Sequence, residues 1–494
     1  MPTILGANSV RDAYQISNSL RFNDGDSPSL QFTPSSDSNE QTWTVSFWVK
    51  RGVMGTSSSQ MIFASDTNYD EYVFCRFCGT EVSNKTDMFQ VFMVEPNVRE
   101  GNVRTARLFR DPSAWYHIVV RCDLTQGTAA DRLRIYVNGV KETSFDTASY
   151  LNQNDDNINW NSNVPQAIGH QKQASSVERH LDGYLAYFHN IDGTSLGPDS
   201  FGETDSNGVW IPKKYSGSYG TNGYKLEFKQ TGTSANAAGI GADTSGKGHH
   251  WTPANLAATD VGIDTPQNNY CTINSVYADD GNNLVAADFS QGNRKMLSTV
   301  DGWKFGRGTF LLEAGKWYVE VKATETGAGE NGRFGLQPSQ GGVNLGNSDD
   351  NDTFEGLTVG LGGTDTNLEK LDTGSGSVIF SDFASGNIAM LAIDLDNNKI
   401  WVGRQGTWYN NNNASTTLSP SNHDIALPTV SLGWVFGLGM TRNGSNNITF
   451  EYNWGNPAHA ISSGNSDADG HGNFEFAVPS GFFAVNTKNL AEYG

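Results

Sequence analysis

Exposed tryptophans and asparagine-rich loops are the features of this sequence best suited to binding a ligand. Sugar rings stack on exposed aromatic faces, and asparagine side chains offer paired donors and acceptors to hydroxyl groups. The tryptophans expected to face outward are Trp48, Trp160, Trp401 and Trp408, and WYNNNNAS (408–415) is the asparagine-rich loop. We therefore predict glycan contacts from Trp160, Trp408, Tyr409 and Asn410. The alternative is that these residues are buried between domains or subunits.

The sequence lacks the residue patterns expected of common catalytic sites. Glycoside hydrolases need two carboxylates flanking the scissile bond, roughly 5–5.5 Å apart in retaining enzymes, and no E-x-D-x-E-like triplet occurs. Asp394 and Asp396 are spaced by two, but they border a turn between two predicted strands, which favours a structural role. Neither a G-x-S-x-G elbow nor an H-E-x-x-H helix is present. We predict that the protein is not an enzyme.

Metal-binding patterns are also incomplete. Cys75 and Cys78 form a CxxC without a second pair, and the surrounding YVFCRFCG is typical of a strand. The four cysteines, Cys75, Cys78, Cys122 and Cys271, are interpreted as structural residues in a reducing compartment. Asp243, His249 and His250 lie in a glycine-rich run, where a solvated loop is favoured over a metal site. No cofactor is required by any of these patterns.

Length and charge narrow the class of protein. A chain of 494 residues favours two compact units. A formal net charge of -20 disfavours nucleic acid and anionic membranes as partners. The start, MPTILGANSVRDAYQ, shows no secretory signal, and no apolar run approaches the roughly 18 residues that span a bilayer. We expect synthesis in a cytoplasm without a signal peptide, no membrane insertion and, if the protein works outside a cell, release by lysis or on a particle.

Alternation of apolar and polar residues predicts an all-β fold. Trp43, Val45, Phe47 and Val49 share one face of a half-buried strand. Asn138-Gly139 between two alternating runs predicts a type I′ hairpin turn. Further strands are expected at 115–120, 182–191, 223–229, 315–322, 390–403 and 448–454. Gly, Ser and Asn dominate residues 206–269, which predicts a connector with one embedded strand.

The first predicted unit resembles a known domain family. SFWVKR (46–51), WYHIVV (115–120), RIYVNGV (134–140), AIGH (167–170) and DGYLAYFHNIDGTSLGPDSFGE (182–203) are similar to the laminin G-like, concanavalin A-like lectin domain. The resemblance covers 16–205, after an N-terminal arm at 1–15. It implies a jelly-roll β-sandwich that often holds a calcium ion near one rim. Asp24, Asp26 and Asp182 are the candidate ligands that it implies.

The second predicted unit, 270–494, resembles another sandwich. GKWYVEVK, the AIDLDNNKIWVG hairpin and NWGNPAHA followed by FAVPSGFFAVN are similar to SPRY domains. The fold class is therefore two tandem concanavalin A-like jelly-roll sandwiches joined by a connector.

The tandem order is similar to proteins of marine tailed bacteriophages. It implies a homotrimeric fibre, spike or surface protein of the virion that binds other virion proteins and a host-surface glycan or protein. The alternatives are a capsid or tail decoration protein without a receptor role, and a polysaccharide hydrolase.

Overall fold

The predicted all-β fold class is confirmed. The computed structural model describes residues 14–65, 71–95, 99–156, 158–172, 178–276, 288–297, 302–325, 330–340, 355–361, 368–371, 377–380, 383–410, 413–415, 418, 422–442 and 448–494. Its regular secondary structure is nearly all antiparallel sheet, with 46% of residues in strands and 5% in helices. Within these ranges, no helix has the length and apolar character needed to span a membrane.

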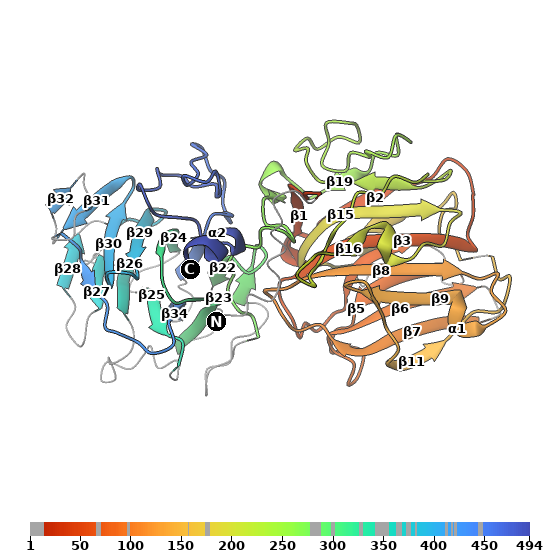
Figure 1. Cartoon of the computed structure of the whole chain (residues 1–494), viewed down its shortest axis with the longest axis horizontal. Coiled ribbons are helices and arrows are strands. Elements are labelled where there is room, and N and C mark those ends of the chain that lie inside the picture. Colours follow the sequence, from red (N-terminus) through yellow and green to blue (C-terminus); the bar gives the residue numbers. More distant parts are fainter. Residues whose placement is uncertain are drawn as a thin grey trace. The chain divides into compact units, whose positions relative to one another are not determined.

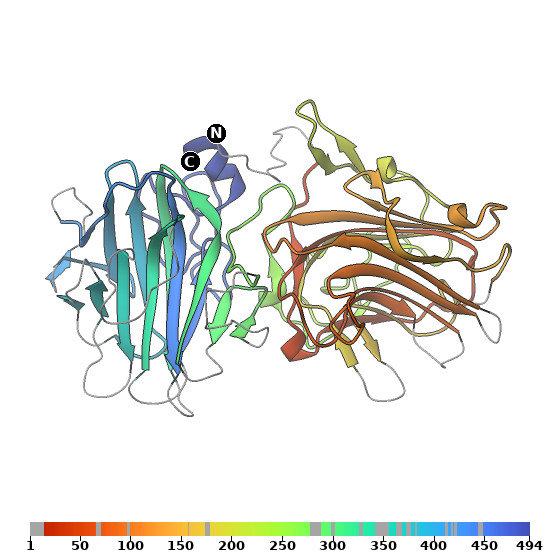
Figure 2. The ribbon, with the colours of Figure 1, turned by 90° about the horizontal axis from the view of Figure 1, so that it is seen from below.

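The chain divides into two compact units, with the boundary between Asn268 and Asn269. The predicted N-terminal arm, 1–15, lies outside the described residues except for Tyr14 and Gln15. The sheets of each unit can be followed in Figures 1 and 2.

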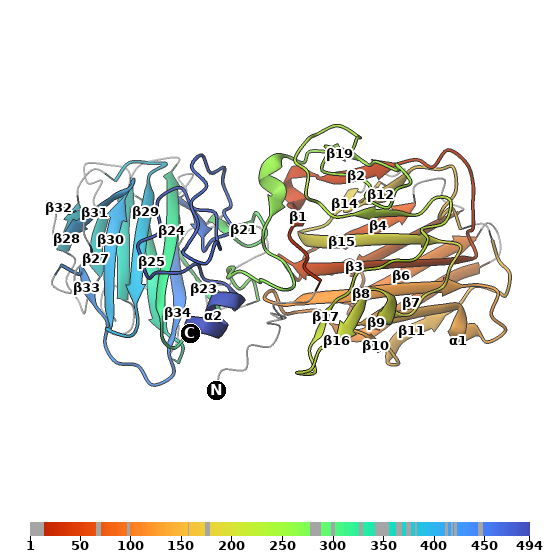
Figure 3. The same ribbon diagram turned by 45° about the horizontal axis from the view of Figure 1, so that its top comes forward.

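Two eight-stranded sheets form the first unit. In spatial order, the first sheet contains β10 (Val140–Lys141), β9 (Leu133–Val137), β8 (Trp115–Asp123), β3 (Thr42–Arg51), β15 (Gly183–Asp192), β1 (Ser19–Phe22) and β20 (Val261–Gly262), with β18 (Tyr224–Leu226) paired to β15. The second sheet contains β11 (Phe145–Ser149), β7 (Arg99–Leu108), β6 (Met88–Glu95), β5 (Tyr72–Phe77), β4 (Gln60–Ser65), β12 (Gln166–Ile168), β2 (Ser29–Phe32) and β19 (Thr252–Ala254). Figure 3 shows β1, β15, β3 and β8 side by side, although they are distant in sequence.

Short elements complete the first unit. They are the pairs β13 (His170–Lys172) with β14 (Glu178–His180) and β16 (Gly202–Thr204) with β17 (Trp210–Pro212), the helix α1 (Ala129–Arg132), and the 3-10 turns η1 (Asp24–Asp26), η2 (Pro198–Ser200) and η3 (Ala258–Asp260). The turn between β9 and β10 has positive φ at Asn138 (47°) and Gly139 (79°), which confirms the predicted hairpin turn.

Strand β3 shows where alternation predicted burial and where it failed. Trp43, Val45, Phe47 and Val49 are fully buried between the sheets, as predicted. Burying each such side chain is worth about 1.5–3 kcal/mol. The opposite face was expected to be solvated, and this prediction is wrong: Thr44, Ser46, Trp48 and Lys50 are buried as well.

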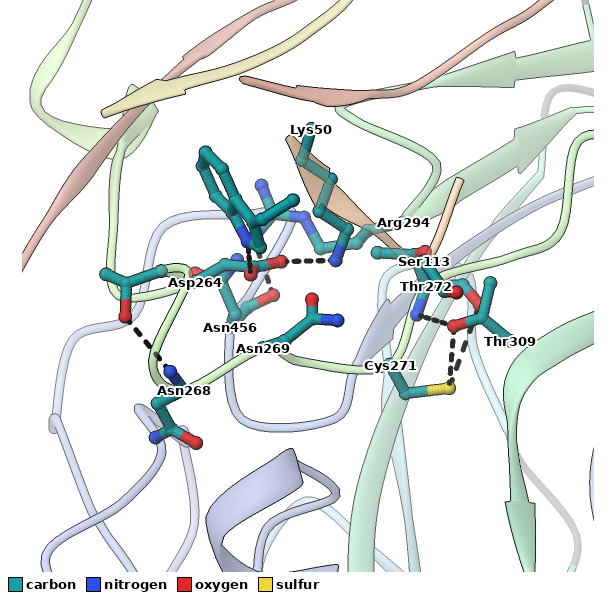
Figure 4. Close-up of polar contacts among 12 residues, drawn as sticks. Lys50, Ser113, Asp264, Asn268, Asn269, Cys271, Thr272, Arg294, Thr309 and Asn456 are labelled. Carbon is teal, nitrogen blue, oxygen red and sulfur yellow. Dashed lines mark hydrogen bonds and ion pairs between the residues drawn. The ribbon is translucent and has the colours of Figure 1, made fainter. Parts of the chain in front are cut away.

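Two later segments of the first unit cover that opposite face. The Thr44 hydroxyl donates to the carbonyl oxygen of Thr194 at 2.8 Å, and the Trp48 ring stacks on His117. The Lys50 ammonium pairs with Asp264 at 2.7 Å (Figure 4). The Trp115 indole N–H donates to the same carboxylate at 2.9 Å. Both faces of β3 are therefore packed.

The predicted connector, 206–269, is instead part of the first unit. Strand β18 pairs with β15, placing Leu226 opposite Phe188, and β19 pairs with β2. Tyr224, Leu226 and Phe228, within the predicted strand 223–229, are buried in the core. Short strands in a glycine-rich segment satisfy the backbone groups of sheet edges without producing a strong alternation pattern.

Two further sheets form the second unit. The nine-stranded sheet contains β21 (Phe289–Ser290), β22 (Lys295–Leu297), β35 (Ile448–Asn453), β24 (Lys316–Glu325), β29 (Ile388–Asp394), β30 (Lys399–Arg404), β31 (Thr407–Asn410) and β32 (Asn413–Ser415), with β33 (Ile425–Ala426) paired to β30. The six-stranded sheet contains β23 (Gly302–Leu312), β34 (Trp434–Arg442), β25 (Glu330–Pro338), β26 (Glu355–Leu361), β27 (Leu368–Leu371) and β28 (Ser377–Phe380). The helix α2 (Thr487–Tyr493) ends the chain.

The nine-stranded sheet of the second unit is also covered on both faces. Trp317, Val319 and Val321 alternate along β24 and are buried on one face. On the other face, Tyr318 and Glu320 are fully buried because residues 455–486 pass over them. The ring of Phe474 meets that of Tyr318 edge-on at 4.9 Å. This covering segment forms one wall of the candidate site.

Candidate binding site

A cavity of about 600 Å³ lies between the nine-stranded sheet and the covering segment of the second unit. Ligand pockets span roughly 300–1,000 Å³. Strands β24, β29, β30 and β31, side by side in Figure 1, supply one wall. The residues lining this tryptophan pocket are Lys316, Asp394, Asn397, Lys399, Trp401, Trp408, Leu418, Ala477, Val478, Pro479, Ser480 and Phe482.

Alternation along β30 aims two of these side chains at the pocket. Ile400 and Val402 are fully buried in the core, so Lys399 and Trp401 lie on the opposite face of the strand. The hairpin from β29 turns through Asn398, whose φ is 56°. The Asp394 carboxylate stabilises this turn by accepting from the backbone N–H and the side-chain amide of Asn397, at 3.0 and 2.9 Å.

Two tryptophans form the aromatic part of the sheet wall. Trp401 is 4% exposed; its indole N–H donates to Asn422 at 3.1 Å and its ring meets Phe482 edge-on at 6.0 Å. Trp408 is partly exposed and pairs with Gly403 across the strands. A Cβ atom at Gly403 would lie 3.1 Å from the Trp408 ring, so the glycine leaves room for the indole.

The loop wall, residues 477–482, is anchored by buried carboxylates. Glu320 accepts from the backbone N–H groups of Glu475 and Phe476 at 3.0 and 2.8 Å. The Tyr318 hydroxyl donates to the same carboxylate at 3.0 Å, and burial raises the pKa of Glu320. On the other side of the loop, Asp467 accepts from the Ala484 N–H at 2.9 Å. These bonds fix the chain immediately before and shortly after the loop wall.

A buried serine–histidine pair in the first unit has the composition of a catalytic dyad but the wrong polarity. Ser46 Oγ lies 2.9 Å from His117 Nε2, and the Trp210 indole N–H lies 3.0 Å from His117 Nδ1. An indole nitrogen can only donate, so Nδ1 accepts and Nε2 carries the proton. His117 therefore donates to Ser46 and cannot take its proton. Burial lowers the pKa of His117 to about 3.

The structure brings Asp24 and Asp182 together at one rim of the first unit. Asp182 is fully buried, and its Oδ1 accepts from the Val53 N–H at 3.0 Å. Its Oδ2 is buried with no hydrogen-bond partner in the described part of the chain. Burial, and then the negative charge of Asp24, raise the pKa of Asp182 to about 7. Asp26 accepts from the Asn23 side chain at 2.7 Å.

Residues 24–193 match the family model of the concanavalin A-like lectin/glucanase superfamily. The match covers most of the first unit and less than half of the chain. No curated protein sequence matches the chain.

Solved structures similar to the chain include a heptameric pentraxin from Limulus polyphemus, with 14% identity, 37% of this chain and 80% of that chain covered, and a TM-score of 0.26. Domains LG4-5 of the mouse laminin alpha1 chain show 10% identity, 88% and 85% coverage, and a TM-score of 0.28. The SPRY domain of human HERC1 shows 12% identity, 32% and 87% coverage, and a TM-score of 0.23.

The structure of the first unit shows that part of the predicted glycan site is wrong. Trp160 lies in its core, fully buried, with its ring 4.8 Å from Phe63 and its indole N–H donating to Asn190 at 3.2 Å. The prediction that Trp48 and Trp160 face outward is wrong, because both indoles fill space between packed layers. The prediction that Trp401 is exposed is also wrong: it lines the pocket but is only 4% exposed. Trp160 and Trp408 thus belong to different units.

Trp408 and Tyr409 lie on β31, beside the tryptophan pocket. Trp408 lines the pocket. The Tyr409 hydroxyl accepts from Arg404 at 3.2 Å, and the guanidinium lies 5.5 Å from the Tyr409 ring centre. The side chain of Asn410 lies outside the described residues.

Two other acidic residues considered in the sequence, Asp243 and Asp396, accept hydrogen bonds from backbone N–H groups. Asp243 accepts from the N–H groups of Lys225, Ser245 and His249 at 2.8–3.0 Å, and Asp396 accepts from Gly315 at 2.9 Å. Within the described ranges, no group of three His, Cys, Asp or Glu side chains is arranged for a metal ion. The four cysteines are buried and unbridged.

Sequence reasoning missed Lys316 and the loop wall of the pocket. The signal for Lys316 was its place in the predicted strand 315–322. The signal for the loop wall was the proline-containing stretch FAVPSGFF (476–483).

Proposed function

We propose that this chain is a non-enzymatic binding protein that takes a saccharide into the tryptophan pocket of its second unit. The supporting observation is that Trp401 and Trp408, on the adjacent strands β30 and β31, both line the pocket opposite a loop fixed by Glu320 and Asp467. A sugar ring presents apolar C–H groups that pack on an aromatic face, and hydroxyl groups that polar side chains can bind.

Among the described residues that line the pocket, Asp394 is the single carboxyl, which does not make the acid and base pair of a hydrolase. That carboxylate is held by Asn397 and by the Lys316 ammonium at 3.0 Å. Glycosidic cleavage needs an acid and a base or nucleophile on both sides of the bond. Release of reducing sugar from a polysaccharide by the purified protein would contradict the non-enzymatic proposal.

Saccharide binding is tested by titration calorimetry with a panel of neutral and acidic oligosaccharides. We expect the parent to bind at least one class, and Trp408→Ala to abolish that binding. The matched control is Trp210→Ala, a partly exposed tryptophan of the first unit, which leaves binding unchanged. Thermal unfolding of each variant verifies the fold. Equal binding by the parent and Trp408→Ala contradicts the proposal.

We further propose that the protein acts on the surface of a phage particle, as a homotrimer in contact with other virion proteins. The support is the sequence resemblance described above. Purified protein should adsorb saturably to host cells and compete with intact particles for attachment. If particles lacking the protein attach normally but lose mechanical stability, the protein is a decoration protein without a receptor role.

A calcium ion at the rim of the first unit is part of the proposal. The buried Oδ2 of Asp182 has no protein donor in the described part of the chain, and Asp24 adds a second carboxylate beside it. Calcium prefers carboxylate and carbonyl oxygens. The residues that would hold it are Asp24 and Asp182, with Asp26 nearby. The ion would neutralise the pair and link η1 to the start of β15.

A further inference from the structure

The loop wall of the tryptophan pocket, residues 477–482, is held firmly at its two ends. Before it, Phe476 donates its backbone N–H to the buried Glu320 carboxylate on β24 at 2.8 Å. After it, the N–H and the carbonyl oxygen of Phe483 each make a hydrogen bond of 2.9 Å with the backbone of β24. Both ends are therefore bonded to the same strand of the nine-stranded sheet.

Between these ends, the loop wall makes no hydrogen bond to the rest of the chain within the described residues. The hydrogen bond that it does make is internal, from the Phe482 N–H to the Pro479 carbonyl oxygen at 3.1 Å. Ala477, Ser480 and Gly481 are exposed. Segments with an exposed backbone and few hydrogen bonds open at a much lower free energy than core strands do. The loop wall is thus a weakly held part of a strongly held sheet.

The internal hydrogen bond closes a turn over Pro479, Ser480, Gly481 and Phe482. The φ angle of Gly481 is 81°, the value found at the third residue of a type II turn and one that L residues rarely adopt. A Cβ atom at Gly481 would meet no other atom within 4 Å. The turn therefore needs glycine for its backbone conformation and not for lack of space.

The last residue of the turn, Phe482, covers a wall of the pocket. Its side chain is 6% exposed, and its ring meets the Trp401 ring edge-on with the centroids 6.0 Å apart. Trp401 lines the cavity, yet only 4% of its surface is exposed. A sugar ring stacks on an aromatic face only where that face is accessible. A saccharide can therefore pack on Trp401 only after Phe482 has moved.

We infer that the loop wall is a lid, which admits a saccharide to Trp401 by breaking the turn between Pro479 and Phe482 and moving Phe482 away from the indole. This inference rests on the proposed saccharide function and adds the regulation of that site. Phe476 and Phe483 stay bonded to β24 and form the two ends of the hinge. Binding through an open state lowers the apparent affinity by the fraction of molecules that are open. Lids of this kind move in microseconds to milliseconds.

The test measures how often Trp401 is uncovered when no saccharide is present. Protein labelled with 5-fluorotryptophan is studied by fluorine NMR with 4-hydroxy-TEMPO, a neutral nitroxide ring comparable in size to a sugar, and Trp401→Phe assigns the resonance. The variant is Gly481→Ala. Its matched control is Gly208→Ala in the first unit, because Gly208 has a φ of 83° and also has no atom within 4 Å of its Cβ position. An L residue is disfavoured in the left-handed region by roughly 5- to 30-fold.

We expect the nitroxide to broaden the Trp401 resonance more than that of Trp160, which is fully buried in the core of the first unit. Gly481→Ala strains the closed turn, so the broadening at Trp401 should rise by up to the same 5- to 30-fold. Gly208→Ala should match the parent. Equal broadening of Trp401 in the parent and Gly481→Ala, or the same rise in Gly208→Ala, overturns the lid. Thermal unfolding verifies that both variants are folded.

The outcomes separate the lid from the proposed saccharide function. If Gly481→Ala raises the broadening as expected but no oligosaccharide of the panel binds to the parent, the lid is supported and the saccharide function fails. If an oligosaccharide of the panel binds the parent and Gly481→Ala with the same association rate and the same affinity, the saccharide function is supported and the lid is overturned. A faster association with Gly481→Ala, absent in Gly208→Ala, supports both.

Discussion

The buried His117 makes the first unit sensitive to acid, and its contribution can be measured. The side chain is 1% exposed and held between Ser46 and Trp210. Burial lowers the pKa of His117 to about 3, against a value near 6.5 in an unfolded chain. Between pH 6.5 and about 3, His117 is protonated in the unfolded state but stays neutral in the folded state. The stability contributed by neutral His117 is therefore present above pH 6.5 and lost as the pH falls.

The magnitude follows from linkage. Each pH unit below the unfolded pKa costs about 1.4 kcal/mol until the folded pKa is reached. Between pH 7 and pH 5, one such histidine lowers the free energy of unfolding by about 2 kcal/mol. Asp182, whose pKa is raised to about 7 by burial, acts in the opposite direction, because the folded state gains a proton first. The pH dependence of the parent's unfolding free energy therefore sums opposite effects, and a comparison with a variant at position 117 isolates that of His117.

The assay compares the parent with His117→Gln, whose amide can accept from Trp210 and donate to Ser46 without titrating. Urea unfolding of both proteins is followed at pH 7 and pH 5. We expect Gln to be less stable than His at pH 7, because the ring also packs against Trp48. That deficit should shrink by about 2 kcal/mol at pH 5. A deficit that is the same at both pH values would refute the assignment of a neutral, buried His117.

Three further predictions concern other buried groups. Glu320→Ala leaves four donors without their acceptor and should destabilise the second unit by about 3 kcal/mol or more in urea unfolding; an unchanged midpoint contradicts the anchoring role. Asp182→Asn removes one of two adjacent carboxyls, so its melting temperature should no longer rise when calcium is added, whereas the parent's should; a rise of equal size in both contradicts the proposed ion. Trp160→Ala should cost the first unit about 3–5 kcal/mol yet leave saccharide titration unchanged, and a loss of affinity in a folded Trp160→Ala protein would restore Trp160 to the site.

The sequence predicted the strands and one face of each well, because alternation is a local property. In β3 and β35 the apolar sets beginning with Trp43 and Ile448 are buried as expected. Alternation does not say whether the other face is covered. Ser46 and Trp48 are buried by the region around Trp210, more than 150 residues away, and no local pattern contains that information.

The candidate site was only partly predictable for the same reason. Trp408 and Trp401 stood out by residue type, and both line the pocket. Trp160 has the same chemistry but lies in the core, because residue type alone does not fix depth. Lys316 reaches the pocket through strand pairing with Asp394, and the loop wall through contacts with Glu320. Such long-range contacts become visible only in the folded chain.

Ligand binding in the tryptophan pocket can be observed residue by residue through fluorine NMR of protein labelled with 5-fluorotryptophan. The chain has 12 tryptophans, and Trp408→Phe and Trp160→Phe assign two of the resonances. On addition of a saccharide that binds in calorimetry, we expect the Trp408 resonance to shift with ligand concentration while the Trp160 resonance stays in place. Saturation of the protein with no movement at Trp408 would contradict binding in this pocket.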